Sequence, residues 1–136
     1  MKITQIKTIR VAQFPDVIWV QVHTDAGIVG LGETWYAATT VEAAIHDFFG
    51  PLLIDKDPHE VEGHWQTMFR LSDHAGYGGA ELRAISALDI ALWDIKGQAL
   101  KLPIYELIGG VTRHRIRVYN TLGVYGDIKD GYDVWR

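Results

Sequence analysis

The chain contains no cysteine among its 136 residues. Without thiols there is no disulfide, no thiolate metal site and no cysteine nucleophile, so these three kinds of site are excluded. The absence of cysteine also fits a cytoplasmic protein, whose thiols are kept reduced, and we expect that location. Serine is nearly as scarce, because it occurs only at Ser72 and Ser86. Ser86 lies within a predicted helix, so no serine nucleophile on a strand-to-helix turn is expected.

A basic surplus and a long apolar run are also missing. Thirteen Lys and Arg residues stand against seventeen Asp and Glu residues, which gives a formal net charge of −4. Nucleic acids and anionic membranes select for basic patches, so we expect neither as a partner. The most apolar stretch, residues 84–100, contains Asp89, Asp94 and Lys96, which argues against a membrane span. The charged N-terminus, MKITQIKTIRV, is not typical of a signal peptide.

The first third of the chain predicts a three-stranded antiparallel meander. Residues 3–11 are rich in β-branched side chains, and residues 17–24 alternate, with Ile18, Val20 and Val22 on one face. Residues 13–16 are predicted as the loop between these strands, and Asp25-Ala26-Gly27 as the next turn. A third strand is expected over residues 28–33, where glycines allow close approach of another backbone.

Helical periodicity follows the meander. Thr39 and Glu42 have the spacing of a capping box, and Gly50-Pro51 is expected to end the helix that they begin. One apolar stripe of that helix would contain Val41, Ala44, Ile45, Phe48 and Phe49. Further helices are predicted over residues 57–71, 80–100 and 104–108, with a small-residue flank for close packing at Ala84, Ala87 and Ala91, and a last strand over residues 115–120.

Pairs of titratable residues do not form a site in this pattern. His59 and His64 are five residues apart, which separates them by about 140° around a helix, so they cannot share a metal ion. Asp89 and Asp94 have the same spacing and do not form a general acid/base pair. We interpret them as capping or salt-bridging residues with Arg83 or Lys96 as partners.

Aromatic residues next to predicted loops are more suggestive. Trp35 and Tyr36 directly follow the third strand, and they serve either core or subunit packing or contact with a ligand. Tyr77 lies in the glycine-rich segment SDHAGYGG (residues 72–79), which suits a lid and also suits any exposed turn.

The segment AISALDIALWDIKGQALKLPIYELIG (residues 84–109) closely resembles the helix signature of one branch of the enolase superfamily, the mandelate racemase and muconate-lactonizing enzymes. The strand end GETW and the SDHAGYGG segment also lie where that family has them, and the resemblance covers residues 1–121. It implies an α+β fold, in which a three-stranded antiparallel meander is followed by a helical bundle. Residues 1–112 would form the N-terminal capping domain, and residues 113–136 the start of a (β/α) barrel that is otherwise absent. A barrel needs about 250 residues, so we expect a chain cut within a longer architecture.

The resemblance also implies an activity for the full-length parent, that of a Mg-dependent lyase. Such an enzyme abstracts the proton α to a carboxylate and eliminates water from a sugar acid, as aldonate and aldarate dehydratases do. In the family the base and the Mg²⁺ ligands are barrel residues, and none of the six lysines here shows the Lys-x-Lys spacing of the base. We therefore expect no catalytic and no metal-binding residue in this chain, a small-molecule carboxylate as substrate, and a homo-oligomer of the full-length protein. A racemase, epimerase or cycloisomerase, or a stand-alone non-catalytic ligand-binding or oligomerisation module, stays open.

What the resemblance carries over to this chain is contact with substrate. In the family two capping-domain loops, here residues 13–17 and 34–40, fold over the barrel mouth and read the distal part of the substrate. Carboxylate and aromatic side chains there would bind the hydroxyls and the chain of a polyol, and residues at the end of the first barrel strand would face the site. The candidate substrate-binding residues are Asp16, Trp35, Tyr36, Tyr77, Asn120 and Thr121.

Overall fold

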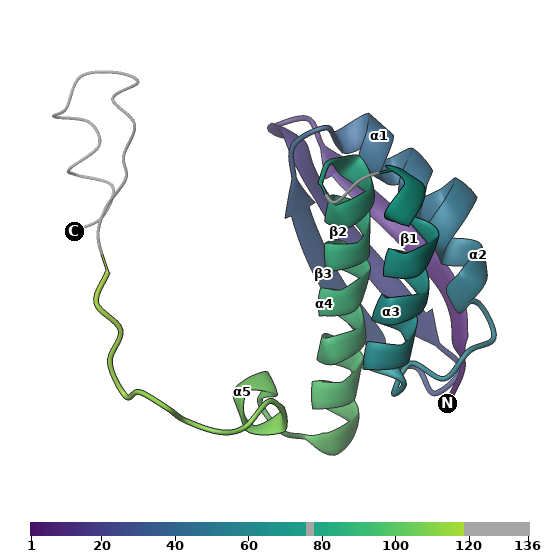
Figure 1. Ribbon diagram of the computed structural model, residues 1–136. Helices are drawn as coiled ribbons and strands as arrows, with labels where there is room; N and C mark the ends of the chain where they lie inside the picture. The colour runs from purple at the N-terminus through teal and green to yellow at the C-terminus, as the bar shows by residue number, and fades with distance from the viewer. Residues whose placement is uncertain (76–77, 119–136) are drawn as a thin grey trace, which may run out of the picture.

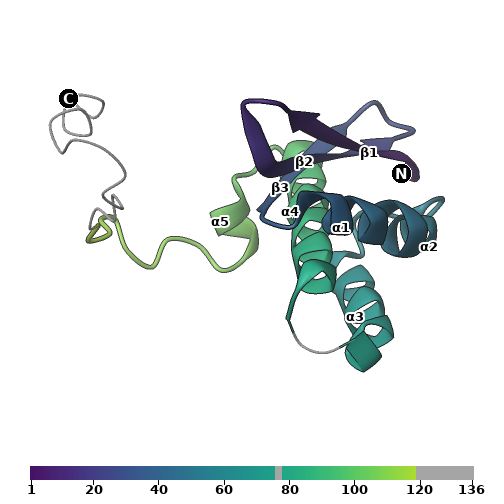
Figure 2. The same ribbon diagram turned by 90° about the horizontal axis from the view of Figure 1, so that it is seen from above.

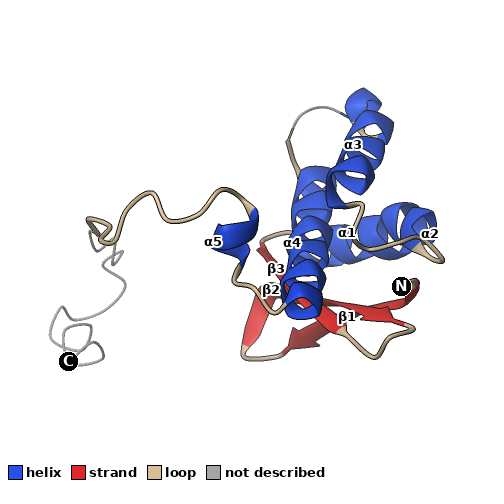
Figure 3. Cartoon of the chain, turned by 90° about the horizontal axis from the view of Figure 1, so that it is seen from below, coloured by secondary structure: helices blue, strands red, loops and turns tan. Residues whose placement is uncertain are grey.

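The computed structural model describes residues 1–75 and 78–118. A three-stranded sheet carries a layer of helices on one face, and no described element covers its other face (Figures 2 and 3). This arrangement confirms the predicted α+β class. The elements in chain order are β1 (Ile3–Val11), β2 (Phe14–Thr24), β3 (Val29–Trp35), α1 (Ala38–Ala43), the π-helix η1 (Ala44–Phe49), α2 (Gly50–Leu53), α3 (Val61–Leu71), η2 (Asp73–Ala75), α4 (Ala80–Leu100) and α5 (Ile104–Leu107).

The sheet is antiparallel in the order β1-β2-β3, as the meander predicts. Ile18, Val20 and Val22 are fully buried against the helices, which confirms the predicted inner face. The loop predicted over residues 13–16 is wrong, because β2 already begins at Phe14, which pairs with Val11. Pro15 suggested a loop, but it falls beside the irregular register between Ile9 and Val11, where the ladder is interrupted and proline is tolerated.

The helical segment after the sheet departs from the predicted α-helical stripe. Its middle, η1, is a π-helix, whose i→i+5 bonds widen the turn. Phe48 is 47% exposed as a result, although the α-helical stripe placed it inside. The residues that are buried instead follow one another at intervals of four: Val41, Ile45, Phe49 and Leu53.

Both predicted ends of this segment are also wrong. Ala37 occupies the N-cap position of α1 with left-handed dihedrals and no side-chain cap, because Thr39 and Glu42 bind residues of β1 instead. The chain continues through Gly50-Pro51 into α2, so that Pro51 lies in the first turn of α2 directly after the π-helix. The helical run ends before Asp55, whose φ is 64°.

The long helix α4 lies across the inner face of the sheet (Figure 1) and has the predicted bounds. Its alanine flank faces β3 so closely that a Cβ atom added at Gly30 would clash with the Ala91 carbonyl oxygen. A Cβ atom at Gly32 would clash with the Ala87 carbonyl oxygen in the same way. The glycines of β3 and the alanines of α4 therefore permit one close helix–sheet contact, as both patterns predict.

The remaining elements correct two further predictions. α3 begins at Val61 rather than at residue 57. Asp57 lies in a turn before this helix, where its carboxylate accepts the His59 N–H at 3.0 Å. After α5 the described chain leads away from the sheet and helices (Figure 1). The strand predicted over residues 115–120 is not formed over residues 115–118, where no described strand is in position to pair with it and where Ile116 and Val118 are exposed. None of the described helices combines the length and the apolar character that crossing a membrane requires.

Candidate functional site

Three of the candidate substrate-binding residues meet at one end of the sheet. Trp35 is the last residue of β3, and Tyr36 donates its backbone N–H to the Asp16 carbonyl oxygen of β2 at 2.9 Å. The Asp16 side chain is exposed in this arrangement. Tyr77, Asn120 and Thr121 lie outside the described residues. The structure thus brings Asp16, Trp35 and Tyr36 together and leaves the other three as predictions.

The two aromatic rings form an exposed pair. Their centroids are 5.6 Å apart with an interplanar angle of 47°, and Trp35 and Tyr36 are 58% and 57% exposed. The alternative that these two residues pack in the domain core is therefore wrong. Contact with a ligand and packing against another subunit are the roles that such a pair suits, because each ring combines a large apolar face with a polar group.

The backbone at this place is unusual. Tyr36 and Ala37 have φ values of 76° and 55°, so two successive residues other than glycine adopt the left-handed region. Each such residue costs about 1–3 kcal/mol and persists only where its surroundings hold it. We refer to Trp35, Tyr36 and Ala37 as the aromatic corner.

Arg83 of α4 contacts the aromatic corner in two ways. Its Nη1 donates to the Trp35 carbonyl oxygen at 2.6 Å, and its guanidinium carbon lies 5.5 Å from the centroid of the Tyr36 ring. Sequence reasoning assigned Arg83 to an ion pair with an aspartate of the same helix and missed this role. One signal was available, because a cation in the first turn of a helix opposes the helix dipole and needs a compensating partner elsewhere.

A second polar cluster ties β1 to α1 and η1. The Thr8 hydroxyl donates to Glu42 Oε1 at 2.6 Å, and His46 Nε2 lies 2.9 Å from the same hydroxyl. Because the hydroxyl has one proton and gives it to Glu42, the His46 nitrogen is the donor in this contact. Arg10 completes the cluster through Thr39 Oγ1 at 3.2 Å and Glu42 Oε2 at 3.5 Å. This cluster holds the β1–β2 hairpin against the helix that follows the aromatic corner.

The aspartates of α4 do not make the predicted salt bridges. Asp94 Oδ2 accepts the Leu31 N–H at 2.8 Å and the Gln98 side-chain amide at 2.9 Å. The Gln98 amide also donates to the Val29 carbonyl oxygen at 2.8 Å, so the pair covers the outer edge of β3. The Lys96 ammonium lies 3.5 Å from the His59 carbonyl oxygen, away from both aspartates.

Asp89 has a distinct electrostatic environment. Partial burial raises the pKa of its carboxyl group above the usual value of 3.8, and the negative charge of Glu62 on α3 raises that pKa further. Both effects disfavour the ionised carboxylate, and no ion pair engages it within the described residues. Asp89 makes no contact with the aromatic corner within the described residues, and its raised pKa is a property of the helical layer.

The described part of the chain offers no metal site. Residues 1–75 and 78–118 contain no group of three His, Asp or Glu side chains that could hold an ion. His64 is buried, and its Nε2 contacts the Asp57 carbonyl oxygen at 2.7 Å, which makes it a structural residue. The Mg²⁺ that the family resemblance implies therefore has no set of ligands among the described residues.

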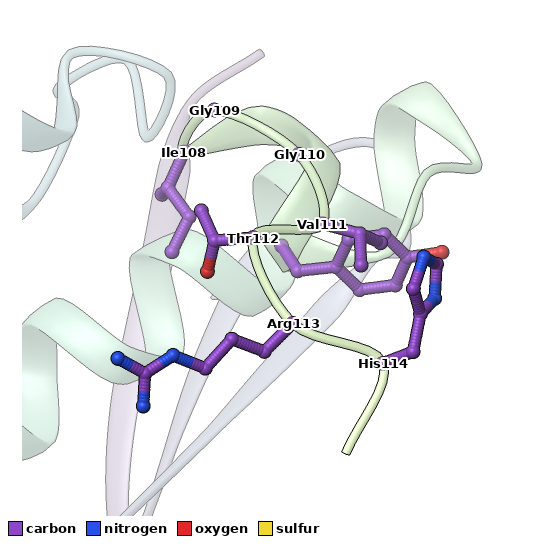
Figure 4. A pocket seen from close by; sticks show the side chains of 8 residues that line it. Ile108, Gly109, Gly110, Val111, Thr112, Arg113 and His114 are labelled. Carbon is purple, nitrogen blue, oxygen red and sulfur yellow. The ribbon is translucent and has the colours of Figure 1, made fainter. Parts of the chain in front are cut away.

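A hollow of about 620 Å³ lies beside α5, far along the chain from the aromatic corner. Its lining comes from Tyr105 and from residues 108–114, which are close together in the chain. Arg113 and His114 point to opposite sides of this segment (Figure 4), so its two basic groups do not converge on a common ligand. The hollow lacks the convergent polar groups of a binding site, and the aromatic corner is the better candidate.

Comparisons with known proteins identify relatives of the chain. The chain is 48% identical over 125 residues to the D-galactonate dehydratase of Variovorax paradoxus and 43% identical to that of Xanthomonas campestris. Each alignment covers 90% of this chain and 32% of the relative, so the chain spans about a third of the length of these relatives.

Solved structures show the same relationship. An enolase of the mandelate racemase subgroup from Agrobacterium tumefaciens superposes with a TM-score of 0.82 at 46% identity, over 88% of this chain and 32% of that chain. The 3,6-anhydro-D-galactonate cycloisomerase from Zobellia galactanivorans superposes with a TM-score of 0.77 at 37% identity, over 82% and 33%. The family described as "Mandelate racemase / muconate lactonizing enzyme, N-terminal domain" matches residues 4–109. The chain therefore belongs to this family of N-terminal domains, as the resemblance of residues 84–109 implied.

Proposed function

We propose that the chain is the capping domain of a sugar-acid dehydratase, a lyase that removes the proton α to a carboxylate and eliminates water. The observation that carries this proposal is the 48% identity over 125 residues to the D-galactonate dehydratase of Variovorax paradoxus. Because the chain spans 32% of that relative, the activity is proposed for the enzyme that carries this domain.

The role of the domain itself is to bind the distal part of the substrate. The exposed rings of Trp35 and Tyr36 offer apolar faces to the C–H groups of a polyol chain, and the Tyr36 hydroxyl offers a hydrogen bond. The Asp16 carboxylate accepts hydrogen bonds from substrate hydroxyls. Tyr77, Asn120 and Thr121 are proposed as further contacts. Together these residues orient the acid and exclude water from it.

The chemical step is proposed to belong to a barrel domain beyond residue 112. Its residues would supply the base and hold Mg²⁺, which stabilises the charge of the ene-diolate in this superfamily. We further propose a small-molecule carboxylate substrate, a cytoplasmic location and a homo-oligomer of the full-length protein. The lack of cysteine supports the location, and the sheet face left open by the described elements supports the oligomer.

A second candidate activity is cycloisomerisation of an anhydro sugar acid. The 37% identity to the cycloisomerase from Zobellia galactanivorans favours it, because both reactions begin with removal of the proton α to a carboxylate. The two activities differ in their mass balance, since dehydration releases water, whereas expulsion of the anhydro-ring oxygen opens the ring and gives an isomer of the substrate.

The test uses the protein encoded by the full reading frame that contains these 136 residues. It is incubated with Mg²⁺ and a panel of aldonic, aldaric and anhydro sugar acids, and 2-keto-3-deoxy products are measured together with their mass, which is lower than that of the substrate by one water only after dehydration. We expect one aldonic or aldaric acid to be dehydrated, and we expect Trp35→Ala to raise KM for that acid about tenfold. Phe48→Ala, an exposed aromatic of η1, is the matched control and leaves KM unchanged. Isomerisation of an anhydro acid without dehydration would select the second candidate, and turnover of neither class contradicts the proposal.

A further inference from the structure

One peptide unit of the aromatic corner is held at both ends. Its carbonyl group, from Trp35, accepts a hydrogen bond from Arg83 Nη1 at 2.6 Å, and its N–H group, from Tyr36, donates to the Asp16 carbonyl oxygen at 2.9 Å. The two partners belong to different elements, α4 and β2. Because a peptide unit is planar, bonds to both of its polar ends fix the orientation of the whole plane.

The conformation that these bonds fix is one that the chain disfavours. Tyr36 and Ala37 both lie in the left-handed region, and neither is a glycine. Such a conformation persists only where the surroundings impose it, and it is concentrated at functional positions. The rings that it presents are exposed, so packing in the domain core is not the reason for it.

Arg83 is suited to impose this conformation because a guanidinium group is planar and has several donors. It bonds the Trp35 carbonyl group and at the same time lies over the Tyr36 ring, with 5.5 Å between the guanidinium carbon and the ring centroid. Within the described residues no ion pair engages Arg83, so its charge is directed at the corner alone. Its backbone is anchored in α4, whose next turn contains the fully buried Ala84 and Ile85.

We propose that Arg83 is a positioning residue that keeps the aromatic corner preformed. On this proposal Trp35 and Tyr36 face the substrate in one fixed orientation, and the corner and the β1–β2 hairpin act as a single unit rather than as two loops that close independently. A preformed corner binds substrate without the cost of ordering two large side chains. The part that concerns substrate rests on the proposed function, whereas the holding of the corner is a property of this domain alone.

The proposal that Arg83 keeps the aromatic corner in one conformation is tested on the 136-residue chain without any substrate. The five tryptophans are labelled with 5-fluorotryptophan, and the ¹⁹F resonance of Trp35 is assigned from Trp35→Phe. In Arg83→Ala we expect this resonance to shift or broaden while those of Trp65 and Trp93 stay in place. The Tyr36 amide should exchange with solvent about tenfold faster, since its peptide plane loses one of two bonds.

Two further variants distinguish the effect of Arg83 on the aromatic corner from a general loss of stability of the domain. Arg70→Ala removes an exposed arginine of α3 that bonds only Gln66 among the described residues, and it should leave the Trp35 resonance and the Tyr36 amide unchanged. Arg83→Lys keeps the charge without the planar fork and should change both readouts in the same direction by a smaller amount. If Arg83→Ala does not fold, Arg83→Lys alone decides.

In the full-length enzyme, Arg83→Ala should raise KM for the sugar acid about tenfold and change kcat less than about twofold, as expected for lost substrate binding. Arg83→Lys should recover part of this loss. A folded Arg83→Ala chain with an unchanged Trp35 resonance and an unchanged Tyr36 amide overturns the proposal. An unaltered enzyme without activity on sugar acids contradicts the proposed function instead, and it leaves the result on the isolated chain standing.

Discussion

The two ends of β3 use glycine and non-glycine residues in opposite ways. At the beginning of the strand, Gly30 and Gly32 have no positive φ, and their missing side chains make room for the carbonyl groups of α4. At its end, Tyr36 and Ala37 adopt the left-handed dihedrals that favour glycine, although both have side chains. At Gly30 and Gly32, close packing against α4 requires a residue without a side chain. At Tyr36 and Ala37, the side chains are present although glycine would adopt this backbone conformation at a lower cost. The contrast distinguishes a packed region from an exposed one within a few residues of one chain.

The largest expected effect is at the packed end. Gly32→Ala places a Cβ atom against the Ala87 carbonyl oxygen, and because backbone cannot move aside cheaply we expect a loss of about 3 kcal/mol in the free energy of unfolding. Urea denaturation measures it. The control is Gly63→Ala in α3, where an added Cβ atom meets nothing within 4 Å and helix propensity predicts a gain of about 1 kcal/mol. Equal effects at both positions would refute the close-contact account.

The next effect concerns the outer edge of β3. Asp94→Ala removes the acceptor of the Leu31 N–H and of the Gln98 amide, and we expect a loss of about 1–2 kcal/mol in the free energy of unfolding. Asp94→Asn retains one acceptor oxygen and should lose clearly less. Faster amide exchange at Leu31 in Asp94→Ala locates the change, and unaltered exchange there would show that this bond contributes nothing.

A smaller effect of opposite sign is expected at the aromatic corner. Ala37→Gly relieves the cost of a φ of 55°, so we expect the free energy of unfolding to rise by up to about 1 kcal/mol, less the entropy that glycine loses. Ala43→Gly, at the last residue of α1, where φ is −59°, is the control and should lower stability by about 1 kcal/mol. Thermal unfolding of the two variants separates these signs, and a loss at both positions would argue against strain in the corner.

The smallest effect depends on pH and belongs to neither end of β3. The folded state raises the pKa of Asp89, so the folded chain binds more protons than the unfolded chain between the unfolded and folded pKa values, and stability falls as pH rises through that window. Asp89→Asn should therefore raise Tm at pH 7 and lose this advantage below a pH of about 3.8, the usual value for the group. A gain from Asp89→Asn that is constant with pH would exclude titration as its cause.

Sequence reasoning succeeded where near neighbours decide the structure. The alternation of Ile18, Val20 and Val22, the turn at Gly27 and the bounds of α4 depend on patterns within a few residues, and the structure confirms them. The glycine and alanine patterns of β3 and α4 were also informative, because small residues on two elements indicate a close contact before the contact is seen.

Predictions from the sequence failed where residues distant in the chain compete with a local preference. Thr39 and Glu42 have the spacing of a cap, but Arg10 and Thr8 bind them from β1, which lies about thirty residues away in the chain. Arg83 bonds a carbonyl group 48 residues before it, and no local pattern predicts such a partner. Of the candidate site, Trp35 and Tyr36 were thus chosen from their place in the sequence, whereas Arg83, which bonds the Trp35 carbonyl group, was not.

The polar side chains along β3 have a consequence for the behaviour of the domain in solution. An unpaired strand edge is a template for aggregation, because its free amide and carbonyl groups pair with strands of other molecules. Asp94, Gln98 and Arg83 occupy such groups at three points of the β3 edge, and the charged Lys7 and Arg10 lie on β1 at the opposite edge. Side chains of α4 that bond the outer edge of β3 thereby also protect an open three-stranded sheet from adding a fourth strand from another copy.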